Sequence, residues 1–137
     1  MPTSHATPQE AEDAYYDAID ELDIEALMEA WEESEEVLCL LPMMPAQRGK
    51  GAIREAWSTL LQPDHRLDIE VAHLSWIETD ELAIHLIEER VKTPQQPEAQ
   101  RVYATNIYRK GAQGWLLLMH QNSPTPPPPG FQMPGMD

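Results

Sequence analysis

The spacing of the apolar residues changes near residue 65. Up to residue 61 they recur every three to four positions, which is the period of an amphipathic helix. From residue 66 onward they alternate with polar residues, which is the period of a half-buried strand. Helices followed by strands are typical of an α+β domain in which the helices pack on one face of an antiparallel sheet. With 137 residues, the chain is long enough for one such domain.

Three helices are predicted in the first half of the chain. The first covers residues 7–22, where Thr7 and Glu10 have the spacing of a capping box. A shorter helix follows Asp23, which is a favourable N-cap residue, and a third covers about residues 51–61. Because the first two are short and nearly contiguous, we expect all three to pack against the sheet that follows.

Four long strands are predicted after the helices, at residues 66–77, 81–92, 100–110 and 114–122. Within the first of them the apolar parity shifts between Val71 and Leu74, which indicates a β-bulge that bends the strand. An earlier apolar run, 36–41, predicts a short strand that is followed by an irregular loop. We expect a single domain over residues 1–124. The proline-rich tail, 125–137, should be extended and polyproline-like.

The formal net charge is −15, and the first 36 residues hold 13 acidic residues without a single Lys or Arg. Most of these acids are interpreted as solvated helix faces, including, on the first helix, Glu12, Asp13, Asp17, Asp20 and Glu21. A surface this acidic repels phosphate groups. We therefore expect neither nucleic acid nor an anionic membrane as a partner. With no apparent signal or membrane segment, and with Cys39 as the single cysteine, we expect a cytoplasmic protein.

Three segments in this order carry a family resemblance: AYYDAIDELDIEALMEAWEESEEVLCLLP, QRGKGAIREAW and YATNIYRKGAQGWLLLMHQNSP. Together they resemble the nuclear-transport-factor-2-like superfamily, and within it the SnoaL-like and ketosteroid isomerase-like branches. The resemblance implies a cystatin-like α+β roll, with a cone-like curved antiparallel sheet and three helices on its concave face. It also implies a pocket inside the cone, and a homodimer.

The isomerase branch needs a carboxylate base and an oxyanion hole made of a tyrosine and a protonated aspartate. Aligned on Asp23, the tyrosine falls at Tyr15, the base at Leu41 and the aspartate near Thr105. A leucine cannot accept a proton, so we do not expect steroid isomerase activity.

The residues expected to bind a ligand in the pocket are mostly large and apolar: Tyr15, Trp31, Met43, Met44, Trp57 and Asn106. The candidate catalytic residues are His85 and His120, because an imidazole exchanges protons near neutral pH. His120 shares strand parity with Leu116 and Leu118. No cofactor and no metal site is expected, since the sequence has no His-x-His, no HExxH and no paired cysteines.

Two functions remain open. The first is a homodimer that binds an apolar or aromatic small molecule in the cone; catalysis by histidine-assisted proton transfer is an option that the sequence does not decide. The second is a non-catalytic dimerisation or association module. It would use the outer sheet face, where Tyr103 and Ile107 could meet a twofold mate.

Overall fold

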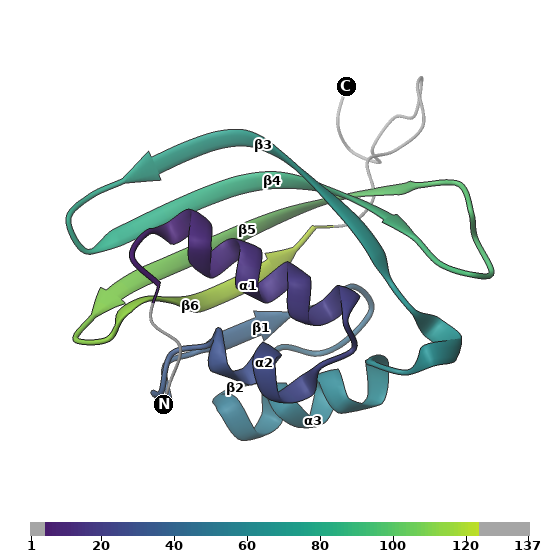
Figure 1. The fold of residues 1–137 in the computed structure, drawn as a ribbon, viewed down its shortest axis with the longest axis horizontal. Helices are drawn as coiled ribbons and strands as arrows, with labels where there is room; N and C mark the ends of the chain where they lie inside the picture. The colour runs from purple at the N-terminus through teal and green to yellow at the C-terminus, as the bar shows by residue number, and fades with distance from the viewer. Residues whose placement is uncertain (1–4, 124–137) are drawn as a thin grey trace, which may run out of the picture.

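The computed structural model describes residues 5–123, which form three α-helices and a six-stranded sheet (Figure 1). The helices are α1 (Pro8–Asp20), α2 (Ile24–Glu29) and α3 (Lys50–Leu60), followed by a 3-10 turn at Pro63–His65. The strands are β1 (Leu38–Leu40), β2 (Gln47–Arg48), β3 (Asp68–Glu78), β4 (Leu82–Lys92), β5 (Gln100–Gly111) and β6 (Gly114–Asn122). The predicted tail, 125–137, lies outside the described residues. Within residues 5–123, every helix is too short or too polar to cross a membrane.

The strands are ordered β2-β1-β6-β5-β4-β3 in one curved sheet. β1 runs parallel to β6, and the other neighbours are antiparallel. In Figure 1, α1 lies across the concave face of the sheet, and α2 and α3 lie near β1 and β2. The predicted α+β cone is therefore confirmed. One difference is that the segment predicted as an irregular loop contains β2, which pairs with β1 through Cys39 and Gln47.

The helix starts follow the predicted capping residues. Thr7 Oγ1 accepts a hydrogen bond from the Glu10 backbone N–H at 3.1 Å, and the Glu10 carboxylate accepts one from the Ala6 N–H at 2.6 Å. Asp23 Oδ1 accepts from the Ala26 N–H at 3.0 Å and starts α2. Each bond satisfies an amide that has no partner inside the helix.

Two bulges decide which side chains face the helices. In β3 the register with β4 shifts between His73 and Ser75, which confirms the predicted bulge. The shift lets both His73 and Trp76 lie on the concave face. A second bulge, in β6, was not predicted: Ile107 pairs with Met119, but Tyr108 pairs with Leu117.

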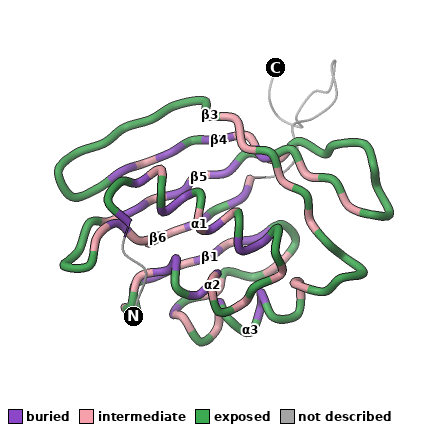
Figure 2. The backbone as a smooth tube through the Cα atoms, viewed as in Figure 1, coloured by how far each residue is buried: buried purple, intermediate pink, exposed green. Residues whose placement is uncertain are grey.

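The second bulge changes the parity of β6. His120 therefore lies on the same buried face as Leu117, and the predicted match with Leu116 and Leu118 is wrong. Buried residues concentrate on this concave face and on the helix sides that cover it (Figure 2). The largest fully buried side chains include Trp31, Tyr15 and Tyr108.

A substitution in the turn between β5 and β6 tests a local constraint on the backbone. Gly114 has φ +96°, and a Cβ on it would lie 2.5 Å from the backbone oxygen of His5. We expect Gly114→Ala to lower the free energy of unfolding by about 1–3 kcal/mol, because it adds both backbone strain and a clash. Gly111→Ala is the matched control, since a Cβ there meets nothing within 4 Å. Urea unfolding measures both variants, and equal losses would contradict this explanation.

Candidate functional site

A cavity of about 240 Å³ lies between the helices and the concave face of the sheet. Its walls are mostly apolar and come from α1, the β1–β2 loop, α3 and the long strands: Tyr15, Ile19, Leu41, Pro42, Met44, Trp57, Leu60, Leu67, Ile69, Val91 and Val102. Its polar lining residues are Glu89, Gln100, His120 and Asn122. This volume lies just below the roughly 300–1,000 Å³ of usual ligand sites, so the cavity suits a compact molecule.

Three of the six residues expected to bind a ligand, Tyr15, Met44 and Trp57, line this cavity. Trp31 is buried in the core but does not reach the cavity. Met43 is fully exposed, because its backbone adopts φ +62° in the loop after β1 and the side chain has no contact that buries it.

Asn106, also expected to bind a ligand, is fully buried and contacts His120 rather than the cavity. The two positions aligned with the carboxyl groups of the steroid isomerases do not lie on the same face of the sheet. Leu41 lines the cavity, whereas Thr105 lies on the outer face, next to inward-facing Asn106.

The polar wall of the cavity is built around the buried carboxylate of Glu89, which is only 5% exposed. The Tyr16 hydroxyl donates to Glu89 Oε2 at 2.6 Å, and Asn122 Nδ2 donates to Oε1 at 2.8 Å. His120 Nε2 lies 3.9 Å from Oε2. A buried carboxylate is stable only where such partners replace water.

Two amide side chains hold the ring of His120 in place. Its Nδ1 lies 2.5 Å from Asn106 Oδ1, and its Nε2 lies 2.7 Å from Asn122 Oδ1. Both amides are oriented by their own donors: Asn106 Nδ2 donates to the Tyr16 hydroxyl at 3.0 Å, and Asn122 Nδ2 donates to Glu89. In this orientation each ring nitrogen faces an amide oxygen, and the two amides hold the ring of His120 beside Glu89.

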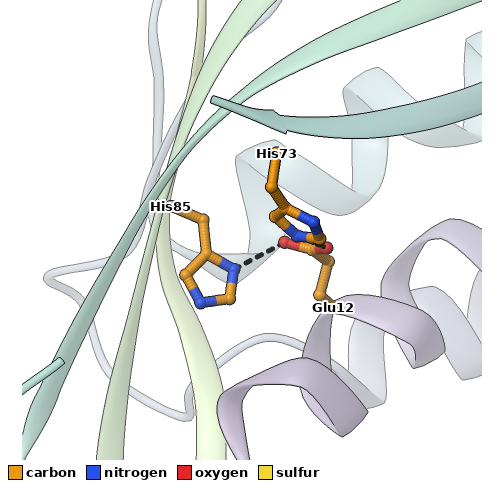
Figure 3. A group of neighbouring side chains, drawn as sticks. All are labelled: Glu12, His73 and His85. Carbon is orange, nitrogen blue, oxygen red and sulfur yellow. Dashed lines mark hydrogen bonds and ion pairs between the residues drawn. The ribbon is translucent and has the colours of Figure 1, made fainter. Parts of the chain in front are cut away.

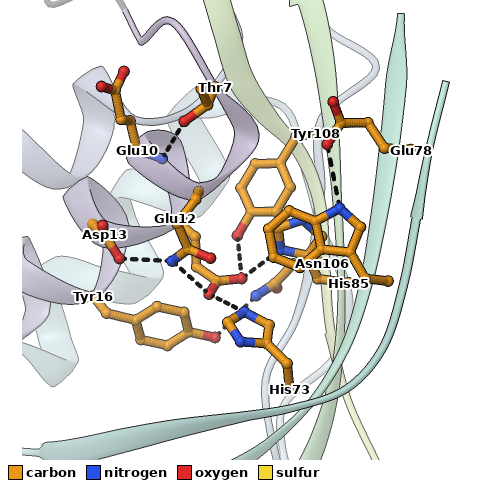
Figure 4. A network of polar contacts seen from close by, with 12 residues as sticks. Thr7, Glu10, Glu12, Asp13, Tyr16, His73, Glu78, His85, Asn106 and Tyr108 are labelled. Carbon is orange, nitrogen blue, oxygen red and sulfur yellow. Dashed lines mark hydrogen bonds and ion pairs between the residues drawn. The ribbon is translucent and has the colours of Figure 1, made fainter. Parts of the chain in front are cut away.

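His85, the other candidate catalytic residue, belongs to a different cluster. Its Nδ1 donates to Glu12 Oε2 at 2.6 Å, and His73 Nε2 donates to Glu12 Oε1 at 2.6 Å (Figure 3). The Tyr108 hydroxyl lies 3.4 Å from Glu12 Oε2 (Figure 4). None of these four residues lines the cavity, so His85 and His120 do not face the same space.

The placement of Glu12 on a solvated helix face is wrong, because this side of α1 packs on the sheet and leaves Glu12 only 2% exposed. Burial alone would raise the pKa of its carboxyl group. The hydrogen bond from His85 and the charges of His73 and His85 outweigh burial and hold the pKa below its usual value. Glu12 is therefore an ionised carboxylate at neutral pH.

Sequence reasoning missed Glu12, Tyr16, His73, Glu89 and Asn122 as site residues. For Glu89 a signal existed, since it alternates in phase with His85 and Ile87 on one strand. For Tyr16 the signal is its position four residues after Glu12, one helical turn away on the same side. The acidic pattern around both residues hid this face.

The tyrosines give a pH test of the buried site. Burial raises the pKa of Tyr15, Tyr16 and Tyr108 well above the model-compound value of 10.0. The folded protein therefore keeps phenolic protons that the unfolded chain loses, and its stability should fall as the pH rises above about 10. We expect their tyrosinate absorbance to appear together with the loss of circular dichroism. Ionisation of all four tyrosines in a chain that keeps its native spectrum would contradict the buried arrangement.

Comparisons with solved structures support the fold. A protein from Thiobacillus denitrificans, provisionally named a calcium/calmodulin-dependent protein kinase type II association domain, is 26% identical, with a TM-score of 0.84 over 90% of this chain and 99% of that one. A provisionally named dehydratase of the NTF2-like family from Streptomyces avermitilis is 24% identical, with a TM-score of 0.76 over 85% and 92% of the two chains.

A ketosteroid isomerase-like protein from Erwinia carotovora atroseptica is 17% identical, with a TM-score of 0.65 over 85% of this chain and 94% of that one. No curated protein sequence matches the chain. The profile of the SnoaL-like domain matches residues 9–127, which include all the residues of the cavity and of both polar clusters. The chain therefore belongs to the SnoaL-like family, within the NTF2-like superfamily that its sequence resembles.

Proposed function

We propose that the protein binds a compact apolar or aromatic molecule in the cavity, with one polar group of the ligand against Glu89, His120 and Asn122. The observation that supports this most directly is an apolar cavity with a charged, hydrogen-bonded wall on β4 and β6. Apolar walls favour burial of the ligand, and a few placed polar groups fix its orientation.

The hydrogen-bonding positions that the cavity wall leaves unused indicate which polar group a ligand would carry. A carboxylate has about four acceptor positions, and Glu89 uses two of them for Tyr16 and Asn122. Glu89 can therefore accept a hydrogen bond from a ligand O–H or N–H. The Tyr15 hydroxyl is buried and has no partner among the described residues, so it can donate to a ligand oxygen.

The same wall has the groups for a proton transfer. Glu89 is a carboxylate that can take a proton from the ligand, and the His120 ring, 3.9 Å away, can pass a proton to another ligand atom. Both groups are buried, so their electrostatic interactions with a bound molecule are strong. We propose histidine-assisted proton transfer as the chemistry of this site.

Ligand binding is tested with a panel of monocyclic phenols and small cyclic ketones, using ligand-observed NMR. We expect Val102→Phe, which fills the cavity, to weaken binding at least tenfold (about 1.4 kcal/mol). Arg101→Phe is the matched control, because it adds the same side chain on the outer face of the same strand. Glu89→Gln should retain binding but stop incorporation of solvent deuterium into the ketones. Equal binding by Val102→Phe and wild type would overturn the proposed site.

A specific observation also favours the second function, dimerisation through the outer sheet face. Ile77 pairs with Ile84, Ile84 with Ile107, and Ile107 with Met119, so one apolar row crosses four adjacent strands. Large apolar side chains near this row are exposed: Leu74, Leu82, Leu86 and Tyr103. We propose a second copy of the chain as the occupant, because a continuous apolar row can pair with itself around a twofold axis.

The dimer is tested by sedimentation at micromolar concentration. We expect the wild type to be a dimer and Ile107→Glu to be a monomer, because the new charge would be buried without a partner. Thr59→Glu is the control, since Thr59 is exposed on α3. A monomeric wild type would refute the dimer and leave ligand binding untouched.

A further inference from the structure

Glu12, His73 and His85 bring three metal-binding atoms together outside the cavity. They come from α1, β3 and β4, which are distant in sequence (Figure 3). One nitrogen of each histidine and a carboxylate oxygen all lie within 4.8 Å of one another. The bulge at Leu74 produces this arrangement, because it keeps His73 on the concave face while Trp76 pairs with His85.

These donors are the types that divalent transition metals prefer. Imidazole nitrogen suits Zn²⁺ and its neighbours in the first row, and a carboxylate adds an anionic ligand. Two histidines and one glutamate are the protein ligands of one common class of catalytic zinc site, in which water occupies the fourth position. We propose that Glu12, His73 and His85 form a binding site for a divalent transition metal ion, with Zn²⁺ as the best-fitting ion.

The distances are compatible with such an ion. Around a tetrahedral Zn²⁺ with bonds of about 2.0–2.1 Å, ligand atoms lie roughly 3.3 Å apart. The two histidine nitrogens now lie 2.6 Å from the oxygens of Glu12. An ion would take the place of the two bridging protons. The histidine nitrogens and the Glu12 oxygens would then move apart by about an ångström or less.

The surroundings hold the ligands in position. Gln9 Nε2 donates to Glu12 Oε1 at 3.3 Å, and the Tyr108 hydroxyl lies 3.4 Å from Oε2 (Figure 4). The ring of Trp76 stacks on His85 with centroids 3.8 Å apart. Such outer contacts orient ligands and reduce the cost of ordering them when the ion binds.

The site has both an entry and a favourable charge. The side chain of His73 is 34% exposed, so an ion can reach the cluster from solvent, while Glu12 and His85 are buried. The net charge of −15 attracts cations to the surface. A dication bound to two neutral histidines and one carboxylate leaves a single positive charge, which the negative net charge of the chain can balance.

The test is a titration of chelator-treated full-length protein with Zn²⁺ and, separately, Co²⁺. We expect one Zn²⁺ per chain, a rise in melting temperature that a chelator reverses, and the strong visible absorption of four-coordinate Co²⁺. Glu12→Gln and His73→Asn should each weaken Zn²⁺ binding at least about 100-fold, since each removes a direct ligand. His73 is partly exposed, so His73→Asn is expected to fold, which circular dichroism verifies.

The matched control is His65→Asn, because His65 is an exposed histidine in the 3-10 turn outside the cluster. It should bind Zn²⁺ like the wild type. The proposal is overturned if wild-type protein binds no stoichiometric ion, if His65→Asn loses as much affinity as His73→Asn, or if folded His73→Asn binds normally. Phenol binding in the cavity should be the same in His73→Asn and wild type, so failure of the metal site and failure of the ligand site are separate results.

Discussion

Two carboxylates are buried between α1 and the sheet, and the arrangement of the concave face depends on the polar partners that replace water around them. Glu12 is held by His73 and His85, and Glu89 is held by Tyr16 and Asn122 beside His120. Removing a carboxylate from water costs several kcal/mol unless close partners compensate it. Each carboxylate therefore needs its polar partners. Those of Glu12 connect α1 to β3 and β4, and those of Glu89 connect β4 to α1 and β6.

The strand bulges make these pairings possible. In a regular strand every second residue faces the helices, so His73 and Trp76 could not both do so. The extra residue in β3 brings His73 towards Glu12 and keeps Trp76 against His85. The extra residue in β6 turns His120 towards the cavity. Two local irregularities thus provide both polar clusters, while the rest of the sheet remains regular.

The fold could be predicted because it depends on periodicity, and the change of spacing near residue 65 separates helices from strands. The β3 bulge was also readable, since Val71 and Leu74 break the alternation. The β6 bulge was not, because the run from Trp115 to Met119 is apolar on both faces and shows no parity. Glu12 could not be distinguished from its acidic neighbours, since burial depends on where α1 crosses the sheet. The separation of His85 and His120 into two clusters was not readable either, because strand parity fixes a face but not a position along it.

Stability alone does not explain why these groups are retained. A buried ion pair contributes little to stability compared with well-packed apolar residues of similar size, and replacing it is often neutral or favourable. Glu12, His85 and Asn106 are almost completely buried. Their presence favours chemistry or binding at both clusters, with the cavity wall suited to an organic ligand and the Glu12 cluster to a metal ion.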